Sequence, residues 1–134
     1  MTKPREFTGE LGIESVSMAD GECVMELEVG AMHQSMARRV HGGVYFTMLD
    51  TVMGRAVISR LPEGRGCATV EAHINYFRPT QEGRIRAVGT CVRLTRRTAY
   101  AEGTLTDADG NMLARSSGTF FLTDTLEQAD RERV

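Results

Sequence analysis

The residues best suited to act on a carbonyl group lie in the run HGGVYFTMLD, at positions 41–50. Gly42 and Gly43 stand at the start of a long apolar segment, which places them at the N-terminus of a predicted helix. The first N–H groups of a helix have no partner within it and lie at the positive end of its dipole. They can bind an anion or polarise a carbonyl oxygen. By itself, His41-Gly42-Gly43 is also typical of an ordinary turn and helix cap.

Asp50 is the second residue of interest, because it stands inside the apolar segment, where alanine or leucine would be less costly. A buried carboxylate destabilises a fold unless it is paired or hydrogen-bonded. Two interpretations of Asp50 follow. Either it is a structural acid satisfied by neighbouring donors, or it lies in a hydrated site that performs chemistry.

A long helix must position these residues. The segment 44–61 lacks proline, is apolar on nearly every side and is bracketed by Gly42-Gly43 and Pro62, which predicts a buried helix. Gly54 within it costs about 1 kcal/mol relative to alanine, so we expect something to pack very close there.

Alternating apolar and polar residues predict strands on both sides of this helix. The expected elements are a hairpin over 11–29, strands over 68–76, 84–95, 99–106 and 112–123, and a frayed charged tail over 124–134. Strict alternation over 68–76 places Thr69, Glu71, His73 and Asn75 on one face. The pattern predicts an α+β fold with a largely antiparallel sheet, which must wrap the helix or pair with another subunit to cover it.

Length and composition narrow the class of protein. The 134 residues suit one domain, 1–134, and a net charge of −2 excludes a nucleic-acid binder that works by bulk charge. The chain has no apolar run of about 18 residues and no apolar signal-peptide core near its start, so we expect a cytoplasmic protein. Three widely spaced cysteines predict reduced thiols. Glu71 and His73 lack a third ligand at a suitable spacing, so we expect no metal.

The run HGGVYFTMLD, between a predicted hairpin and four predicted strands, resembles the hotdog-fold thioesterases. Within them it is most similar to the phenylacetic-acid-pathway (PaaI-like) branch, over about residues 11–123. The resemblance implies a hotdog fold, a sheet wrapped around one central helix. It also implies hydrolysis of an acyl-CoA thioester to a free acid and coenzyme A, with no cofactor beyond the coenzyme A of the substrate.

The resemblance assigns roles to individual residues. It implies that the Gly42 N–H polarises the thioester carbonyl, that Asp50 is a general base or nucleophile, and that His41 holds the turn. Thr69 would help to orient the attacking water. The family usually has an amide side chain six residues before the histidine, where this chain has Ser35, preceded by Gln34.

Geometry predicts that two chains share the site. Eight residues of helix advance about 12 Å, whereas a carbonyl donor and a base must act on one thioester within hydrogen-bond range. We therefore expect a homodimer in which Asp50 of one subunit faces Gly42 of the other, with Gly54 at the helix crossing. The resemblance adds that such dimers often form tetramers.

Substrate contacts are less clearly marked. Arg84, Arg86, Arg93, Arg96 and Arg97 have no acid between them, which is typical of a solvated strand face. Arg96 and Arg97 are also candidates for binding the phosphates of coenzyme A. Tyr76 could line an acyl pocket, although aromatic residues in strands more often belong to the core. Gly43 and Gln34 are further candidates for contacting substrate.

Two other functions stay open at this stage. A non-catalytic acyl-CoA binding protein would keep the fold, and Ser35 at the amide position gives this alternative some support. A hotdog hydratase or dehydratase needs an acid–base pair facing the β-carbon, and His41 is already assigned to the turn.

Overall fold

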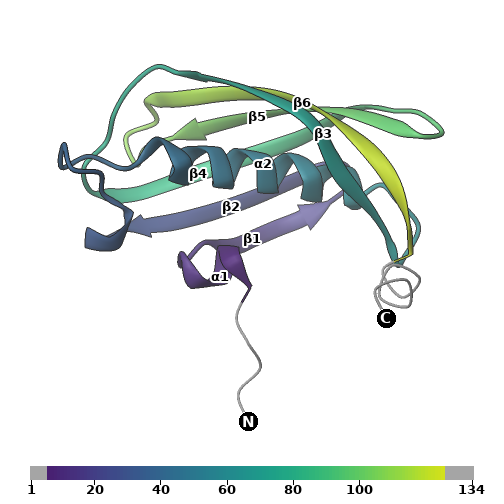
Figure 1. Cartoon of the computed structure of the whole chain (residues 1–134), viewed down its shortest axis with the longest axis horizontal. Coiled ribbons are helices and arrows are strands. Elements are labelled where there is room, and N and C mark those ends of the chain that lie inside the picture. The colour runs from purple at the N-terminus through teal and green to yellow at the C-terminus, as the bar shows by residue number, and fades with distance from the viewer. Residues whose placement is uncertain (1–5, 126–134) are drawn as a thin grey trace, which may run out of the picture.

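The structure of the protein is a computed structural model that describes residues 6–125. Its six strands form a single antiparallel sheet in the order β1-β2-β4-β5-β6-β3, and Figure 1 shows this sheet curving around helix α2. The elements are α1 (Phe7–Glu10), β1 (Glu14–Ala19), β2 (Glu22–Val29), a 3₁₀ helix (Ala31–His33), α2 (Gly42–Ile58), β3 (Arg65–Tyr76), β4 (Gly83–Leu94), β5 (Thr98–Thr106) and β6 (Met112–Thr125). The predicted α+β class and the predicted order of helix and strands are confirmed.

The N-terminal hairpin turns where the sequence predicts it. Asp20 and Gly21 have φ angles of 54° and 85°, in the left-handed region that favours glycine and tolerates aspartate. β1 and β2 then pair antiparallel, from Ala19 opposite Glu22 to Glu14 opposite Glu26.

Helix α2 begins earlier and ends earlier than the predicted span of 44–61. It begins at Gly42 because the Nδ1 atom of His41 accepts a hydrogen bond of 2.8 Å from the Gly43 N–H and caps the first turn. It ends at Ile58, four residues before Pro62, and the Ser59 hydroxyl donates to the Ala56 carbonyl there. The apolar pattern located the helix but carried no information about these caps.

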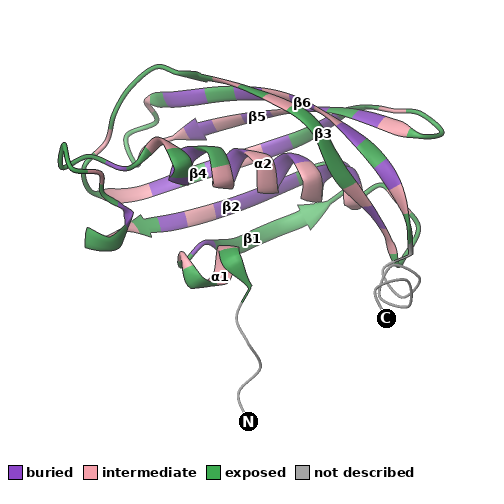
Figure 2. Ribbon diagram, in the orientation of Figure 1, coloured by how far each residue is buried: buried purple, intermediate pink, exposed green. Residues whose placement is uncertain are grey.

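One stripe of α2 remains open in the single chain, so the sheet alone does not provide the full burial predicted for this helix. Figure 2 shows buried positions alternating with partly exposed ones along the helix. The core lies between α2 and the concave face of the sheet, where Met48, Leu49, Val52 and Met53 are completely buried. The partly or fully exposed positions of the helix are Gly42, Gly43, Phe46, Thr47, Asp50, Thr51, Gly54, Arg55 and Ile58. The sheet therefore covers one side of the helix and leaves the side that carries Asp50.

Among the glycines, the one with the tightest contact between helix and sheet is Gly89 of β4, not Gly54. A Cβ atom at Gly89 would lie only 2.3 Å from the Val52 carbonyl oxygen, so β4 admits only glycine there without a shift. A Cβ atom at Gly54 would lie 3.5 Å from the Phe120 ring, an ordinary contact. The prediction of close packing at Gly54 is thus wrong within this chain.

The C-terminal strand extends beyond the predicted span. Asp124 and Thr125, placed in the frayed tail by the sequence pattern, continue β6, and Thr125 pairs with Arg65 of β3. The rest of the predicted tail, 126–134, lies outside the described residues. Within residues 6–125, no helix is long and apolar enough to cross a membrane.

Candidate active site

Asp50 and Thr69, which the resemblance assigns to one site, lie together in the structure. The Thr69 hydroxyl donates a hydrogen bond of 2.8 Å to Oδ1 of Asp50. Asp50 is half-buried on the open stripe of α2, and Thr69 reaches it from β3. This contact fixes one carboxylate oxygen and leaves the second available to a water molecule or a substrate.

A β-bulge at Val70 brings Thr69 to the helix side of the sheet. Thr69 is opposite Phe120 of β6, and Glu71 is opposite the neighbouring residue, Thr119. Val70 is therefore an extra residue of β3 that has no partner on β6. The bulge reverses the alternation of the strand. Thr69, Ala72 and Ile74 all face inward as a result, since the last two pack against the core.

The prediction that Glu71, His73 and Asn75 share the face of Thr69 is therefore wrong. All three are exposed, and Nε2 of His73 lies 3.2 Å from Oδ1 of Asn75. The bulge places them on the opposite side of the sheet from Asp50. Within the described residues, no group of three metal-ligating side chains is found.

Asp50 and Thr69 line a cavity of about 200 Å³. Its other walls are Thr51, Gly54, Arg55, Ile58, Cys67 and Phe120. Burial, together with the nearby negative charge of Asp50, raises the pKa of the Cys67 thiol to about 11. Cys67 therefore stays protonated at neutral pH, with its Sγ 3.5 Å from the Gly54 carbonyl oxygen, and is a poor nucleophile.

The N-terminus of α2 presents one free donor. The Gly43 N–H, a predicted substrate contact, is occupied by His41 Nδ1 at 2.8 Å. Among residues 6–125, no acceptor is paired with the Gly42 N–H. His41 thus caps the helix, in agreement with the turn-holding role implied by the resemblance, and the Gly42 N–H remains able to polarise a carbonyl.

Tyr76 holds the same glycine from the end of β3. Its hydroxyl donates a hydrogen bond of 2.9 Å to the Gly42 carbonyl oxygen, and its ring stacks on Tyr45 with centroids 5.9 Å apart. Partial burial raises the pKa of the Tyr76 hydroxyl, which keeps it protonated as a donor. Beside Gly42 is a cavity of about 280 Å³ lined by Arg39, Val40, Tyr45, Tyr76, Phe77, Arg78 and Pro79.

Gly42 and Asp50 do not form one site within a single chain. Both lie on α2, eight residues apart, which corresponds to about 12 Å along the axis. They line different cavities, one at the start of the helix and one near its middle. The separation expected from the sequence is present in the structure.

The loop before α2 directs Gln34 and Ser35 into local contacts. The Gln34 amide donates to the Gln81 carbonyl at 2.8 Å, and the Ser35 hydroxyl accepts from the Ala37 N–H at 3.3 Å. Arg38 has a φ of 58°, a conformation that favours glycine. Neither Gln34 nor Ser35 lines the cavity beside Gly42.

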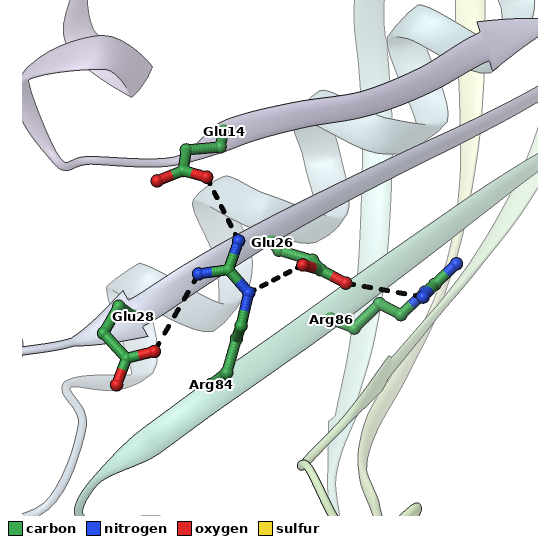
Figure 3. A network of polar contacts seen from close by, with 5 residues as sticks. All are labelled: Glu14, Glu26, Glu28, Arg84 and Arg86. Carbon is green, nitrogen blue, oxygen red and sulfur yellow. Dashed lines mark hydrogen bonds and ion pairs between the residues drawn. The ribbon is translucent and has the colours of Figure 1, made fainter.

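The arginines of β4 and the following turn fall into two groups. Figure 3 shows Arg84 surrounded by Glu14, Glu26 and Glu28. The N–O distances from Arg84 to these carboxylates are 3.1, 2.6 and 3.8 Å, and Arg86 is also paired to Glu26, at 3.4 Å. These ion pairs cross three strands, so Arg84 and Arg86 are not part of a free basic patch.

Arg96 and Arg97 are exposed in the turn between β4 and β5 and form no ion pair with any other described residue. The Arg97 carbonyl accepts from Leu122, which pairs with Cys67. The turn therefore lies at the Asp50 end of the sheet, where the two cations remain available to an anionic ligand.

Comparison with known proteins decides the family. The model of the thioesterase superfamily matches residues 38–114, a span that contains the His41 cap, α2 and the strands β3, β4 and β5. The chain belongs to the thioesterase superfamily. This membership confirms the predicted class, a thioester hydrolase, and with the solved structures below it confirms the hotdog fold.

Individual relatives align with this chain over most of their length. The human acyl-coenzyme A thioesterase 13 is 30% identical over 122 residues, covering 89% of this chain and 86% of that protein. The phenylacetic acid degradation protein PaaI of Thermus thermophilus, in a mutant structure, is 30% identical with a TM-score of 0.78, covering 86% and 96%. A hypothetical thioesterase protein of Streptococcus pneumoniae, solved with coenzyme A, is 27% identical with a TM-score of 0.77, covering 84% and 90%.

Two features of this site have no signal in the sequence pattern. Val70 is an ordinary strand residue, and nothing in its type predicts a bulge. Cys67 lines the cavity of Asp50 although its spacing suggests only a structural thiol. Only the family resemblance assigned Asp50 and Thr69 to one site.

Proposed function

We propose that this protein is an acyl-CoA thioesterase whose active site is shared between two subunits. The observation that carries the proposal is the carboxylate of Asp50, fixed by Thr69 at 2.8 Å, on the same helix as a Gly42 N–H that has no acceptor among the described residues. The two groups supply a base and a carbonyl donor, which are the requirements of thioester hydrolysis.

The chemistry follows from these two groups. The Gly42 N–H donates to the thioester carbonyl oxygen and stabilises the negative charge that develops there. Asp50 accepts a proton from water as the water oxygen bonds to the carbonyl carbon. The carbon–sulfur bond then breaks, and the thiolate of coenzyme A leaves and takes up a proton. If Asp50 attacks the carbon directly, an anhydride forms first and water cleaves it.

The edge of the sheet supports a shared site. β3 ends the strand order, so one of its edges pairs with no strand within residues 6–125, and its twelve residues offer a long row of backbone groups to a second copy. Thr69 lies at the Asp50 end of β3, and Tyr76 lies at the Gly42 end. If two β3 strands pair antiparallel about a twofold axis between these residues, the Asp50 end of each strand lies beside the Gly42 end of the partner's strand.

In such a dimer, Asp50 of one protomer approaches Gly42 of the partner subunit. The open stripe of α2 then faces the second copy, which accounts for the half-exposed positions that the sheet leaves uncovered. Two dimers could assemble further into the tetramer implied by the resemblance. The proposal requires only the dimer.

Coenzyme A is the proposed carrier of the acyl group. Human acyl-coenzyme A thioesterase 13 is named for acyl-coenzyme A substrates, and the Streptococcus pneumoniae protein was solved with coenzyme A. The exposed Arg96 and Arg97 are the proposed contacts for its phosphates, since the guanidinium fork suits phosphate oxygens. The hydrolytic step above needs no metal or redox cofactor.

The test is a thiol-release assay with aromatic and aliphatic acyl-CoA substrates on the wild-type protein and on Asp50→Asn. We expect release of coenzyme A by the wild type and a loss of about 10²–10⁴-fold in kcat for the variant, the range for a positioned base. Thermal stabilisation by acyl-CoA without any thiol release would instead support a binding protein. Turnover of Asp50→Asn at the wild-type rate would remove Asp50 from the mechanism.

A further inference from the structure

Two side chains hold the peptide group between Gly42 and Gly43, one at its N–H and one at its carbonyl oxygen. The Gly42–Gly43 peptide has its N–H bonded to Nδ1 of His41 at 2.8 Å and its carbonyl bonded to the Tyr76 hydroxyl at 2.9 Å. The Tyr76 ring also closes over Gly42, since a Cβ atom there would lie 3.4 Å from the ring. A peptide fixed at its donor and its acceptor cannot rotate about the bonds that flank it.

The fixed peptide restricts the direction in which the neighbouring Gly42 N–H points. The Gly42 N–H belongs to the preceding peptide, and only the two backbone dihedrals of Gly42, φ and ψ, separate the two peptide planes. Glycine has the widest freedom in φ of all residues, so without an external restraint this donor would sample several directions. A donor that acts on a developing oxyanion must already point at it, because reorientation during the reaction costs rate.

We propose that Tyr76 is a positioning residue that orients the Gly42 N–H toward the thioester carbonyl. The inference rests on the proposed function and adds a residue to it. Tyr76 acts through Gly42, and its role differs from the direct substrate contact that the sequence suggested.

The surroundings of Tyr76 suit this role. Its ring stacks on Tyr45 at an interplanar angle of 16°, and the Tyr45 hydroxyl donates to the Arg78 carbonyl at 3.1 Å. The two stacked rings are therefore anchored at both hydroxyls, that of Tyr76 to Gly42 and that of Tyr45 to Arg78. Tyr76 and Thr69 also belong to one strand. β3 therefore holds Gly42 through the Tyr76 hydroxyl and the Asp50 carboxylate through the Thr69 hydroxyl.

The experiment measures carbonyl polarisation directly. Benzoyl-CoA labelled with ¹³C at the carbonyl is bound to Asp50→Asn, which slows turnover, and isotope-edited infrared spectroscopy records the carbonyl stretch. We expect the bound carbonyl to shift to lower frequency in the Asp50→Asn protein. Tyr76→Phe keeps the ring and removes the hydroxyl. Added to Asp50→Asn, it should raise the carbonyl stretching frequency most of the way back to its value for the substrate in water.

Kinetics on the otherwise wild-type chain provide the second readout. We expect Tyr76→Phe to lower kcat about tenfold while KM changes little, a fraction of the loss seen when a donor is removed outright. Tyr100→Phe, the same chemical change at an exposed residue of β5, is the matched control and should retain wild-type kcat. Thr69→Val is the second control, because it should lower kcat and leave the infrared shift intact.

The outcomes separate the two proposals. A clear infrared shift that Tyr76→Phe leaves unchanged, with kcat also unchanged, would overturn the role of Tyr76 and leave the thioesterase proposal standing. Absence of thiol release by the wild type would overturn the proposed function itself. A fall in kcat with an unchanged infrared shift would also refute the positioning role, since it would show that the hydroxyl acts elsewhere.

Discussion

Replacing Gly42 by proline removes the proposed carbonyl donor and little else. Gly42 is the first residue of α2, a position where proline is favoured because its missing N–H would have no partner within the helix. His41 before it has φ −61° and ψ 135°, the extended conformation that a residue preceding proline prefers. The added Cβ atom would lie 3.4 Å from the Tyr76 ring, at the near limit of ordinary contact.

The expected loss is large because no second backbone donor replaces the first. The Gly43 N–H is held by His41, so Gly42→Pro leaves the carbonyl oxygen without a donor from the helix. Deleting one donor of this kind lowers kcat by about 10²–10³-fold, equivalent to ~2.7–4 kcal/mol of transition-state stabilisation. KM should change far less, because the donor acts mainly on charge that develops during the reaction.

Thiol release at saturating acyl-CoA measures the effect, with circular dichroism to confirm the helix. Gly42→Ala is the matched control, since it adds the same Cβ atom and keeps the N–H. Its loss in kcat should be at least about tenfold smaller than that of the proline variant. Equal kcat values for the folded proline and alanine variants would refute the assignment of Gly42.

Three further results are expected. Thr69→Val should lower kcat about tenfold or more, because hydrogen bonds to charged groups contribute about 1.5–3 kcal/mol, and steady-state kinetics with an unchanged melting curve would show it. Cys67, with a pKa of about 11, should react slowly with iodoacetamide at pH 8 and about tenfold faster per pH unit toward pH 10, whereas a rate that is flat over this range would exclude the raised pKa. Gly89→Ala should destabilise the fold by about 1–3 kcal/mol in urea unfolding, because its Cβ atom would meet the Val52 carbonyl at 2.3 Å, and unchanged stability would show that α2 can move away.

The sequence predicted the architecture because burial periodicity is a local signal. Strand alternation and the apolar span of α2 are visible in consecutive residues, and so is the Asp20-Gly21 turn. The start of α2 was predicted two residues late, since a side-chain cap does not appear in a hydrophobic pattern. The end of β6 was missed because Asp124 is polar, although pairing with β3 continues past it.

The candidate site was predicted in part. Family resemblance brought Asp50 and Thr69 together, whereas strict alternation placed Thr69 on a face with Glu71 and His73. The bulge at Val70 decides between these expectations, and bulges depend on the partner strand more than on local sequence. The ion pairs of Arg84 were missed for a similar reason, because Glu26 lies 58 residues away in the chain.

The most direct test of the shared site is a heterodimer of two inactive subunits. Asp50→Asn and Gly42→Pro subunits with different tags are co-expressed and purified through both tags in turn. One site of this dimer combines the intact Asp50 of one protomer with the intact Gly42 of its partner, so it should recover about half of the wild-type kcat per dimer. Activity no higher than that of the two parent variants, or a failure of the two subunits to associate, would contradict a site built from two chains.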